Sequence, residues 1–408
     1  MQNAAYLGGV RLVALALAVA ALGLPAAHAS SPPPVPGLVY TAGYGNSIVT
    51  RFDPVTLERS GPRVRLGGNA SSWSYSPQGR YLAIASYPQR LTVVDVAALR
   101  VVARLRLAPG GGVVHAVSWV APNRVLAVVN TPYGARVVAI DPLARRVVRR
   151  TKLRRPFAYA VARLPDGLAF LLGPRRGLAP VQVAVVDAEG RVRIATVGSA
   201  AIGSVARGSG AGMVLERHTP GFAVDPVGRR AYVVNAGNRI VEVDLETLAV
   251  SYPGPLRTLA KSIAGSYRDA RWLGGGLIAV SGSDRATGAA AGVRPTLAGV
   301  RIVDVRSWTT RTIDPAAEGF DVAGELLLVM SSESRYALRV TAYGFDGRER
   351  YSLDLAGSTW MKEQGRLGYA CRDALLRSVV DLATGAVVRS GFAPSTRCPT
   401  LLAGDSRF

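Results

Sequence analysis

The feature that most constrains the fold is a unit of short strands and turns that recurs along the whole chain. It is clearest over residues 219–250, TPGFAVDPVGRRAYVVNAGNRIVEVDLETLAV. This stretch predicts strands at 221–224, 230–235 and 239–244, and the start of a fourth at 248–251. The inner strands are almost continuous in apolar and β-branched residues, which indicates a sheet buried on both faces. Because one small sheet cannot cover both its own faces, the unit is expected to stack against further copies.

An aspartate at the end of the third strand marks each copy of the unit. In residues 219–250 it is Asp244, whose carboxylate is placed to accept backbone N–H groups of the following turn. Its equivalents, one per unit, are Asp53, Asp95, Asp141, Asp187, Asp304, Asp346 and Asp381. A period in the forties with four strands per unit is typical of a β-propeller. We therefore expect one all-β propeller over residues 37–408, with eight four-stranded blades, or seven if one weak unit is miscounted.

The first 29 residues have the pattern of a signal peptide. Arg11 supplies the positive charge, residues 12–24 are apolar, and Ala27-His28-Ala29 fits a small-x-small cleavage site. The apolar run is shorter than the roughly 17 residues that span a bilayer, although an uncleaved anchor remains the alternative. Residues 30–36 are a Pro-rich leader. The sequence therefore predicts a secreted or extracytoplasmic protein with no membrane span after cleavage.

The two ends of the chain suggest how the ring closes. The first unit opens at residues 38–40 with no strand before it, and the last leaves a spare strand-like piece at 397–402. This tail is expected to supply the innermost strand of the first blade, which removes both open edges. Cys371 and Cys398, the only two cysteines, are predicted to form a disulfide worth about 3–4 kcal/mol. A reactive thiol is the alternative.

The motif over residues 232–244 resembles a known repeat. Tyr232-Val233-Val234-Asn235, followed by Gly237-Asn238-Arg239-Ile240 and Val243-Asp244, is similar to the repeat of the YVTN-type bacterial β-propellers. Residues 39–41 with 45–49 are a looser copy. The resemblance implies a propeller that is exported, as members of that family typically are, and it implies no ligand.

The charge of the chain leaves two interpretations open. The net charge is +22, and of the 49 cationic residues only Lys152, Lys261 and Lys362 are lysines. Such a field attracts polyanions, which include acidic polysaccharide, wall phosphate polymers, nucleic acid and an anionic membrane face. A general bias toward Arg, Ala, Gly and Val explains the same numbers without a partner. The densest run, residues 145–155, is expected on the outermost strand of the third blade, where charges also discourage edge-to-edge pairing.

Motifs of catalysis are scarce. After cleavage of the signal peptide only His115 and His218 remain, and there is no nucleophile elbow, zinc-ligand spacing, phosphate-binding loop or nucleic-acid motif. We therefore predict no catalytic residue, no metal ligand and no cofactor.

Topology gives the candidate site. In a four-stranded blade, the connection to the next blade lies on the same face as the turn between strands two and three. Two long segments, 198–219 and 282–299, and the turn 173–180 are therefore expected on one face of neighbouring blades, where long loops are commonly functional or disordered. The predicted ligand-binding residues are Arg175, Arg176, Arg207, Glu216, Arg217, His218, Arg268, Asp284, Arg285 and Arg294. The alternative is that these are mobile loops with solvated arginines.

Four polar residues near the starts of innermost strands are expected at the adjacent channel mouth: His115, Tyr159, Arg268 and Glu318. His115 also fits a core strand, because valines and alanine surround it. The function that we predict is an exported, non-catalytic binding or scaffold module for a protein, a glycan or an anionic polymer. The alternative is a propeller enzyme of the lactonase or lyase type. Such enzymes place a metal on inner-strand groups, for which the candidates by position are Glu318, Asp321, Asp269 and His218.

Overall fold

A computed structural model describes residues 38–41, 47–87, 89–107, 111–153, 156–207, 214–236, 239–253, 263–286, 295–334, 337–372, 375–393 and 396–401. The contacts divide the chain into residues 1–31 and 32–408, and every described residue belongs to the second unit. The predicted signal peptide, the Pro-rich leader and Arg294 lie outside the described residues. Within the described residues, no helix is long and apolar enough to cross a membrane.

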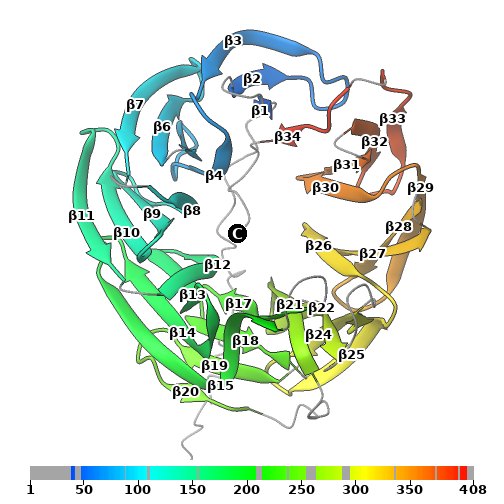
Figure 1. Ribbon diagram of the computed structural model, residues 1–408. Coiled ribbons are helices and arrows are strands. Elements are labelled where there is room, and N and C mark those ends of the chain that lie inside the picture. The colour runs from blue at the N-terminus through cyan, green and yellow to red at the C-terminus, as the bar shows by residue number, and fades with distance from the viewer. Residues whose placement is uncertain are drawn as a thin grey trace, which may run out of the picture. The chain divides into compact units, whose positions relative to one another are not determined.

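The described elements are all strands, and they form the blades of a β-propeller arranged in a ring (Figure 1). The described strands form seven sheets, and we name each four-stranded sheet after its first strand. The β4 sheet contains β4 (Ala70–Tyr75), β5 (Tyr81–Ser86), β6 (Arg90–Asp95) and β7 (Arg100–Arg106). The β8 sheet contains β8 (Val113–Ala121), β9 (Arg124–Thr131), β10 (Gly134–Asp141) and β11 (Arg146–Lys152).

Three further four-stranded sheets have the same consecutive antiparallel order. The β17 sheet contains β17 (Gly221–Asp225), β18 (Arg230–Val234), β19 (Ile240–Asp244) and β20 (Val250–Ser251). The β26 sheet contains β26 (Gly319–Ala323), β27 (Leu326–Ser334), β28 (Ala337–Gly344) and β29 (Glu349–Ala356). The β30 sheet contains β30 (Trp360–Gln364), β31 (Leu367–Arg372), β32 (Leu375–Asp381) and β33 (Val387–Ser390).

The β1 sheet joins the two ends of the unit. It contains β1 (Leu38–Thr41), β2 (Ile48–Phe52), β3 (Arg59–Arg65) and β34 (Thr400–Leu401), in the order β3-β2-β1-β34. Strand β34 pairs antiparallel with β1, and Figure 1 shows the red β34 beside the dark blue β1. The C-terminal tail therefore supplies the innermost strand, as the sequence predicted. The predicted disulfide between Cys371 and Cys398 is also confirmed, with 5.9 Å between the two Cα atoms.

The seventh sheet has ten strands. They are β12 (Pro156–Leu164), β13 (Gly167–Pro174), β14 (Gly177–Asp187), β15 (Val192–Arg207), β16 (Val214–Thr219), β21 (Ile263–Gly274), β22 (Leu277–Ala286), β23 (Thr296–Leu297), β24 (Val300–Asp304) and β25 (Thr309–Asp314). Strand β16 pairs antiparallel with β15 and parallel with β21. It thus connects the run β12–β15 to the run that begins at β21.

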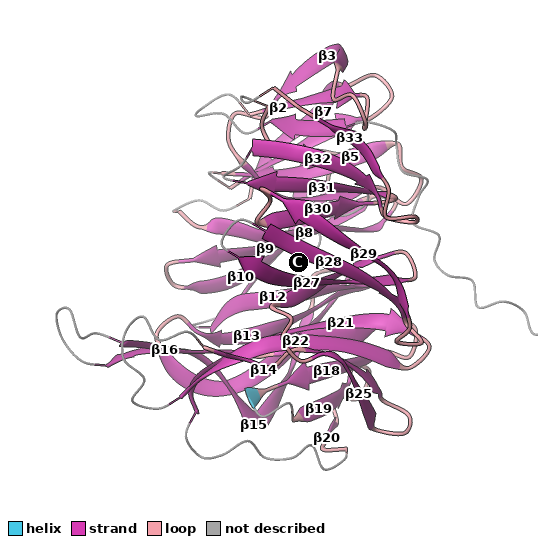
Figure 2. Ribbon diagram, turned by 90° about the vertical axis from the view of Figure 1, so that its right-hand side faces the viewer, coloured by secondary structure: helices cyan, strands magenta, loops and turns pink. Residues whose placement is uncertain are grey.

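The long segments expected as loops are in large part strands. Residues 198–207 continue β15, and 214–219 form β16, so that each pairs its backbone groups with a neighbour. Residues 282–286 extend β22. Figure 2 shows β15 and β16 extending on the left beyond the strands around them. The expectation that these stretches are loops is therefore wrong for their described residues, which belong to strands.

The sheets are buried on both faces, as the apolar strands predicted. In β5, for example, Leu82, Ala83 and Ile84 are all 0% exposed. Each aspartate that ends a third strand accepts backbone N–H groups of the next turn; in Asp244 these come from Glu246 and Thr247 at 2.9 and 2.7 Å. These bonds hold the pKa of Asp244 below its usual value. The repeated aspartate is therefore a turn-forming residue.

Candidate functional site

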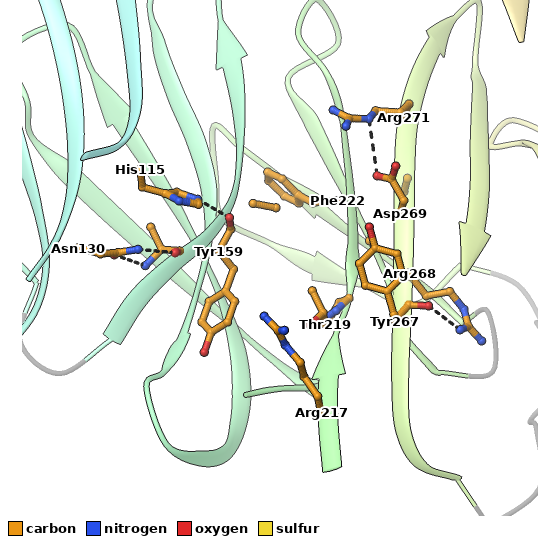
Figure 3. A pocket seen from close by; sticks show the side chains of 15 residues that line it. His115, Asn130, Tyr159, Arg217, Thr219, Phe222, Tyr267, Arg268, Asp269 and Arg271 are labelled. Carbon is orange, nitrogen blue, oxygen red and sulfur yellow. Dashed lines mark hydrogen bonds and ion pairs between the residues drawn. The ribbon is translucent and has the colours of Figure 1, made fainter. Parts of the chain in front are cut away.

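A cavity of about 420 Å³ lies where the innermost strands β8, β12, β17 and β21 begin (Figure 3). Three of the four residues predicted at the channel mouth line it: His115, Tyr159 and Arg268. Glu318 is not among the lining residues; it accepts a hydrogen bond from Ser332 at 3.1 Å. The cavity therefore gathers side chains from three sheets, which are supplied by residues as far apart as His115 and Arg271.

One wall of the cavity is fixed by hydrogen bonds between β9 and β12. Asn130 Nδ2 donates to the Ala158 carbonyl at 2.8 Å, and its Oδ1 accepts from the Ala158 N–H at 2.9 Å. His115 Nε2 donates to the Tyr159 carbonyl, which assigns its proton to that nitrogen. Burial lowers the pKa of His115, and the bond to Tyr159 partly opposes this. His115 is therefore neutral near pH 7.

The lining of the cavity includes a cation between two phenols. Figure 3 shows Arg217 between Tyr159 and Tyr267. Burial raises the pKa of both tyrosines, and the positive charge of Arg217 opposes the rise in each. Arg217 is exposed and has no ion pair with any carboxylate in the described part of the chain. Among the described residues, no carboxylate therefore offsets the positive charge of Arg217 at the cavity.

The other cations of the cavity wall are paired. The Arg268 side chain is 0% exposed and its Nη2 lies 2.8 Å from Asp284 Oδ2. Figure 3 shows its guanidinium directed away from the cavity centre, where it also donates to the Tyr267 carbonyl at 2.9 Å. Arg271 Nε lies 3.6 Å from Asp269 Oδ1. These two pairs place a positive charge beside a negative one, so each contributes little net field.

The remaining predicted residues are distributed around this cavity. Arg285 and Arg217 line a smaller hollow of about 140 Å³ beside it. His218 lies on β16 next to β21, with its Nδ1 3.2 Å from Ser266 Oγ. Arg175 and Arg176 form the exposed turn between β13 and β14, where the Arg175 guanidinium lies 5.8 Å from the Phe157 ring centre. Arg207 and Glu216 belong to β15 and β16.

The residues proposed for a metal are dispersed. Among Glu318, Asp321, Asp269 and His218, Asp269 lines the cavity, where it is paired with Arg271. Asp321 Oδ1 accepts from the Val322 N–H at 2.9 Å. The residues that the structure describes contain no group of three or more His, Cys, Asp or Glu able to hold a metal ion.

Sequence reasoning missed Asn130 and Tyr267. Asn130 follows Val128-Val129 as Asn235 follows Val233-Val234, and this shared pattern is the signal that marks it. The Asn235 side chain also forms a hydrogen bond to a neighbouring strand, since its Nδ2 donates to the Ser199 carbonyl of β15 at 3.1 Å. Tyr267 precedes the predicted Arg268, and because side chains alternate along a strand, it faces the cavity where Arg268 points away.

Comparison with known proteins supports the architecture. No protein-family model and no curated protein sequence matches the chain. Among solved structures, the dihydro-heme d1 dehydrogenase NirN in complex with DHE is similar, with a TM-score of 0.58 and 15% identity over 91% of this chain and 74% of that chain. BamB from Moraxella catarrhalis has a TM-score of 0.43 and 13% identity over 81% of this chain and 92% of its own. NirN, like this chain, is a β-propeller protein, and the likeness extends to the fold alone. Sheet topology and this likeness together identify the chain as a β-propeller protein.

Proposed function

We propose that this chain is an exported β-propeller that binds an acidic sugar of a glycan in the cavity at the channel mouth. The observation that carries the proposal is Arg217, which lines the cavity without a carboxylate partner in the described residues. Arg268 and Arg271 lie in the same wall but have Asp284 and Asp269 beside them. An acidic ligand therefore gains most from Arg217, through charge-assisted hydrogen bonds.

The size and lining of the cavity support a sugar as the body of the ligand. A volume of about 420 Å³ lies within the usual range for small-molecule sites. Tyr159 and Tyr267 offer apolar ring faces together with hydroxyl groups, which suits a molecule with both C–H and O–H surfaces. Arg217 then supplies the bond to the carboxylate or phosphate group of that sugar.

The same proposal includes the finer architecture and the compartment. We take β12–β15 and the group β21, β22, β24 and β25 as two separate blades that β16 connects, which gives eight blades in all. The repeat resemblance supports membership of a YVTN-type family, and the apolar run at residues 12–24 supports export with cleavage near Ala29.

The test is calorimetric titration of the purified protein with glucuronate and glucose 6-phosphate, with glucose as the neutral control. We expect both acidic sugars to bind and glucose to bind at least tenfold more weakly. Arg217→Gln should abolish the preference for acidic sugars. Arg191→Gln, which removes an exposed arginine outside the cavity lining, should preserve it.

Two results would overturn the proposal: equal binding of glucose and glucuronate, or an Arg217→Gln protein that keeps the acidic preference. Metal analysis of the same sample addresses the enzyme alternative. Stoichiometric metal bound to the purified protein, lost on Asp269→Asn, would favour catalysis at the channel mouth over simple binding.

A further inference from the structure

The positive charge of this chain is unevenly distributed. Residues 38–155, which include strands β1 to β11, contain 18 Lys and Arg but only four Asp and Glu. Residues 156–408 contain 30 Lys and Arg and 23 Asp and Glu. Cations are thus nearly as frequent in both parts, and the difference lies in the scarcity of carboxylates. A general bias toward arginine explains the cations but leaves this scarcity unexplained.

The cations of this region gather on three outer strands. We call the ten exposed residues on β3, β7 and β11 the basic rim: Arg59, Arg63, Arg65, Arg100, Arg104, Arg106, Arg146, Arg149, Arg150 and Lys152. None of the ten forms an ion pair with a carboxylate of the described residues. Figure 1 shows the three strands following one another along the outer edge of the ring.

The four carboxylates of this region are used elsewhere. Asp53 accepts the backbone N–H groups of Val55 and Thr56, and Asp95 accepts that of Ala98. Asp141 accepts the N–H of Ala144 in the same way. Glu58 precedes β3 and is exposed. Three of the four carboxylates therefore form turns, and none of the four is paired with a cation of the basic rim.

Arginines on the later sheets provide the contrast. Several of them lie beside a carboxylate of the same sheet or of one of its turns: Arg230 with Glu242, Arg306 with Asp304, Arg339 with Asp354, Arg350 with Asp346 and Arg366 with Asp381. Protection of an outer edge against strand pairing needs charge of either sign. Edge protection therefore explains why β3, β7 and β11 carry charged residues. It does not explain why all of these charges are positive.

We propose that the basic rim binds a flexible linear polymer of phosphate groups. Guanidinium groups match phosphate geometry, and a row of unpaired arginines neutralises successive charges along a chain. The rim follows a convex edge, so a flexible chain can contact all three strands, whereas a flat membrane touches such an edge at one place (Figure 1). The rim strands carry no aromatic residue on which a nucleobase could stack. A polymer without bases fits best.

The experiment measures binding of long-chain inorganic polyphosphate to the purified protein over 50–200 mM salt. The rim variant carries Arg63→Gln, Arg100→Gln, Arg106→Gln and Arg150→Gln, whose side chains form no hydrogen bond or ion pair with the described residues, so the strand pairing of their backbone is kept. The control variant carries Arg191→Gln, Arg306→Gln, Arg348→Gln and Arg377→Gln, which are exposed and lie on other sheets or turns. Both variants lose four positive charges.

We expect the rim variant to bind polyphosphate at least tenfold more weakly at 0.1 M salt, with the slope of log K against log salt reduced by about 3, since each neutralised charge contributes about 0.7. The control variant should bind as the original protein does. Equal losses in the rim and control variants would show a net-charge effect and overturn the site. Tighter binding of single-stranded DNA or anionic vesicles than of polyphosphate, at equal phosphate concentration, would overturn the partner class.

Discussion

The ion pair between Arg268 and Asp284 gives the sharpest test of how burial changes the contribution of an ion pair to the free energy of unfolding. Its closest atoms are 2.8 Å apart, the Arg268 side chain is 0% exposed and the Asp284 side chain 14% exposed. Arg339 and Asp354 are also 2.8 Å apart, but their side chains are 41% and 65% exposed. The two pairs therefore differ in solvent access at the same distance.

The change is Asp284→Asn, with Asp354→Asn as the matched control. Asparagine keeps the shape of the side chain but removes the negative charge, so Arg268 is left buried without its counterion. Breaking a buried pair in this way costs about 3–5 kcal/mol. Arg339 is already hydrated, so Asp354→Asn should cost less than about 1 kcal/mol.

The measurement is urea unfolding followed by tryptophan fluorescence, with the free-energy change taken from the shift in midpoint at a common slope. An equal slope in all three proteins is the control for unchanged unfolding behaviour. The reasoning is refuted if Asp284→Asn costs less than about 1 kcal/mol, or if the two variants lose the same stability. The double replacement Arg268→Met with Asp284→Leu should recover much of the loss, because it leaves no unpaired buried charge.

Three further predictions concern the rest of the fold. The Cys371–Cys398 disulfide links residues 27 apart, and its reduction should lower the unfolding free energy by about 3–4 kcal/mol. As a control, a protein with both cysteines replaced by serine should not respond to reductant. An unchanged unfolding midpoint on reduction would contradict the prediction. Because burial lowers the pKa of His115, the unfolded chain takes up a proton that the folded protein resists, so stability should fall as the pH drops below about 6.5, by up to about 1.4 kcal/mol per pH unit. Thermal melts at pH 7.5 and 5.5 should show a smaller loss for His115→Gln; equal losses would refute the assignment. Gly282→Ala should destabilise, because a Cβ there would lie 2.0 Å from a carbonyl oxygen of β21, whereas Gly319→Ala meets nothing within 4 Å and should change the midpoint little.

The repeating fold was predictable because its signals are local. The turn 225–228 and Asp244 specify where strands end through their own backbone preferences and hydrogen bonds. The same pattern at the other units fixes the strand order within each sheet. Pairing of β34 with β1 was also predictable, because the first blade lacks an innermost strand and the C-terminal tail is a spare one.

The long segments show where local signals end. Residues 198–219 lack a strong strand pattern, yet the described parts, 198–207 and 214–219, form the end of β15 and the strand β16. Strand β16 lies parallel to β21, which is more than forty residues further along the chain. This pairing depends on the position of a neighbouring sheet, which the residues of the segment do not encode.

The sequence by itself determined the class of fold, the turns, the disulfide partners and the excess of arginine. Only the tertiary structure decided which arginines have a carboxylate beside them and which do not. Arg268 is paired with Asp284 across two strands, and Arg217 is left without a carboxylate in the described residues. The basic rim lies on strands that carry no carboxylate, in sheets whose three aspartates form turns. The reason is physical: local preferences act between neighbours in the chain, whereas the strength of a charge depends on burial and on partners that folding brings near.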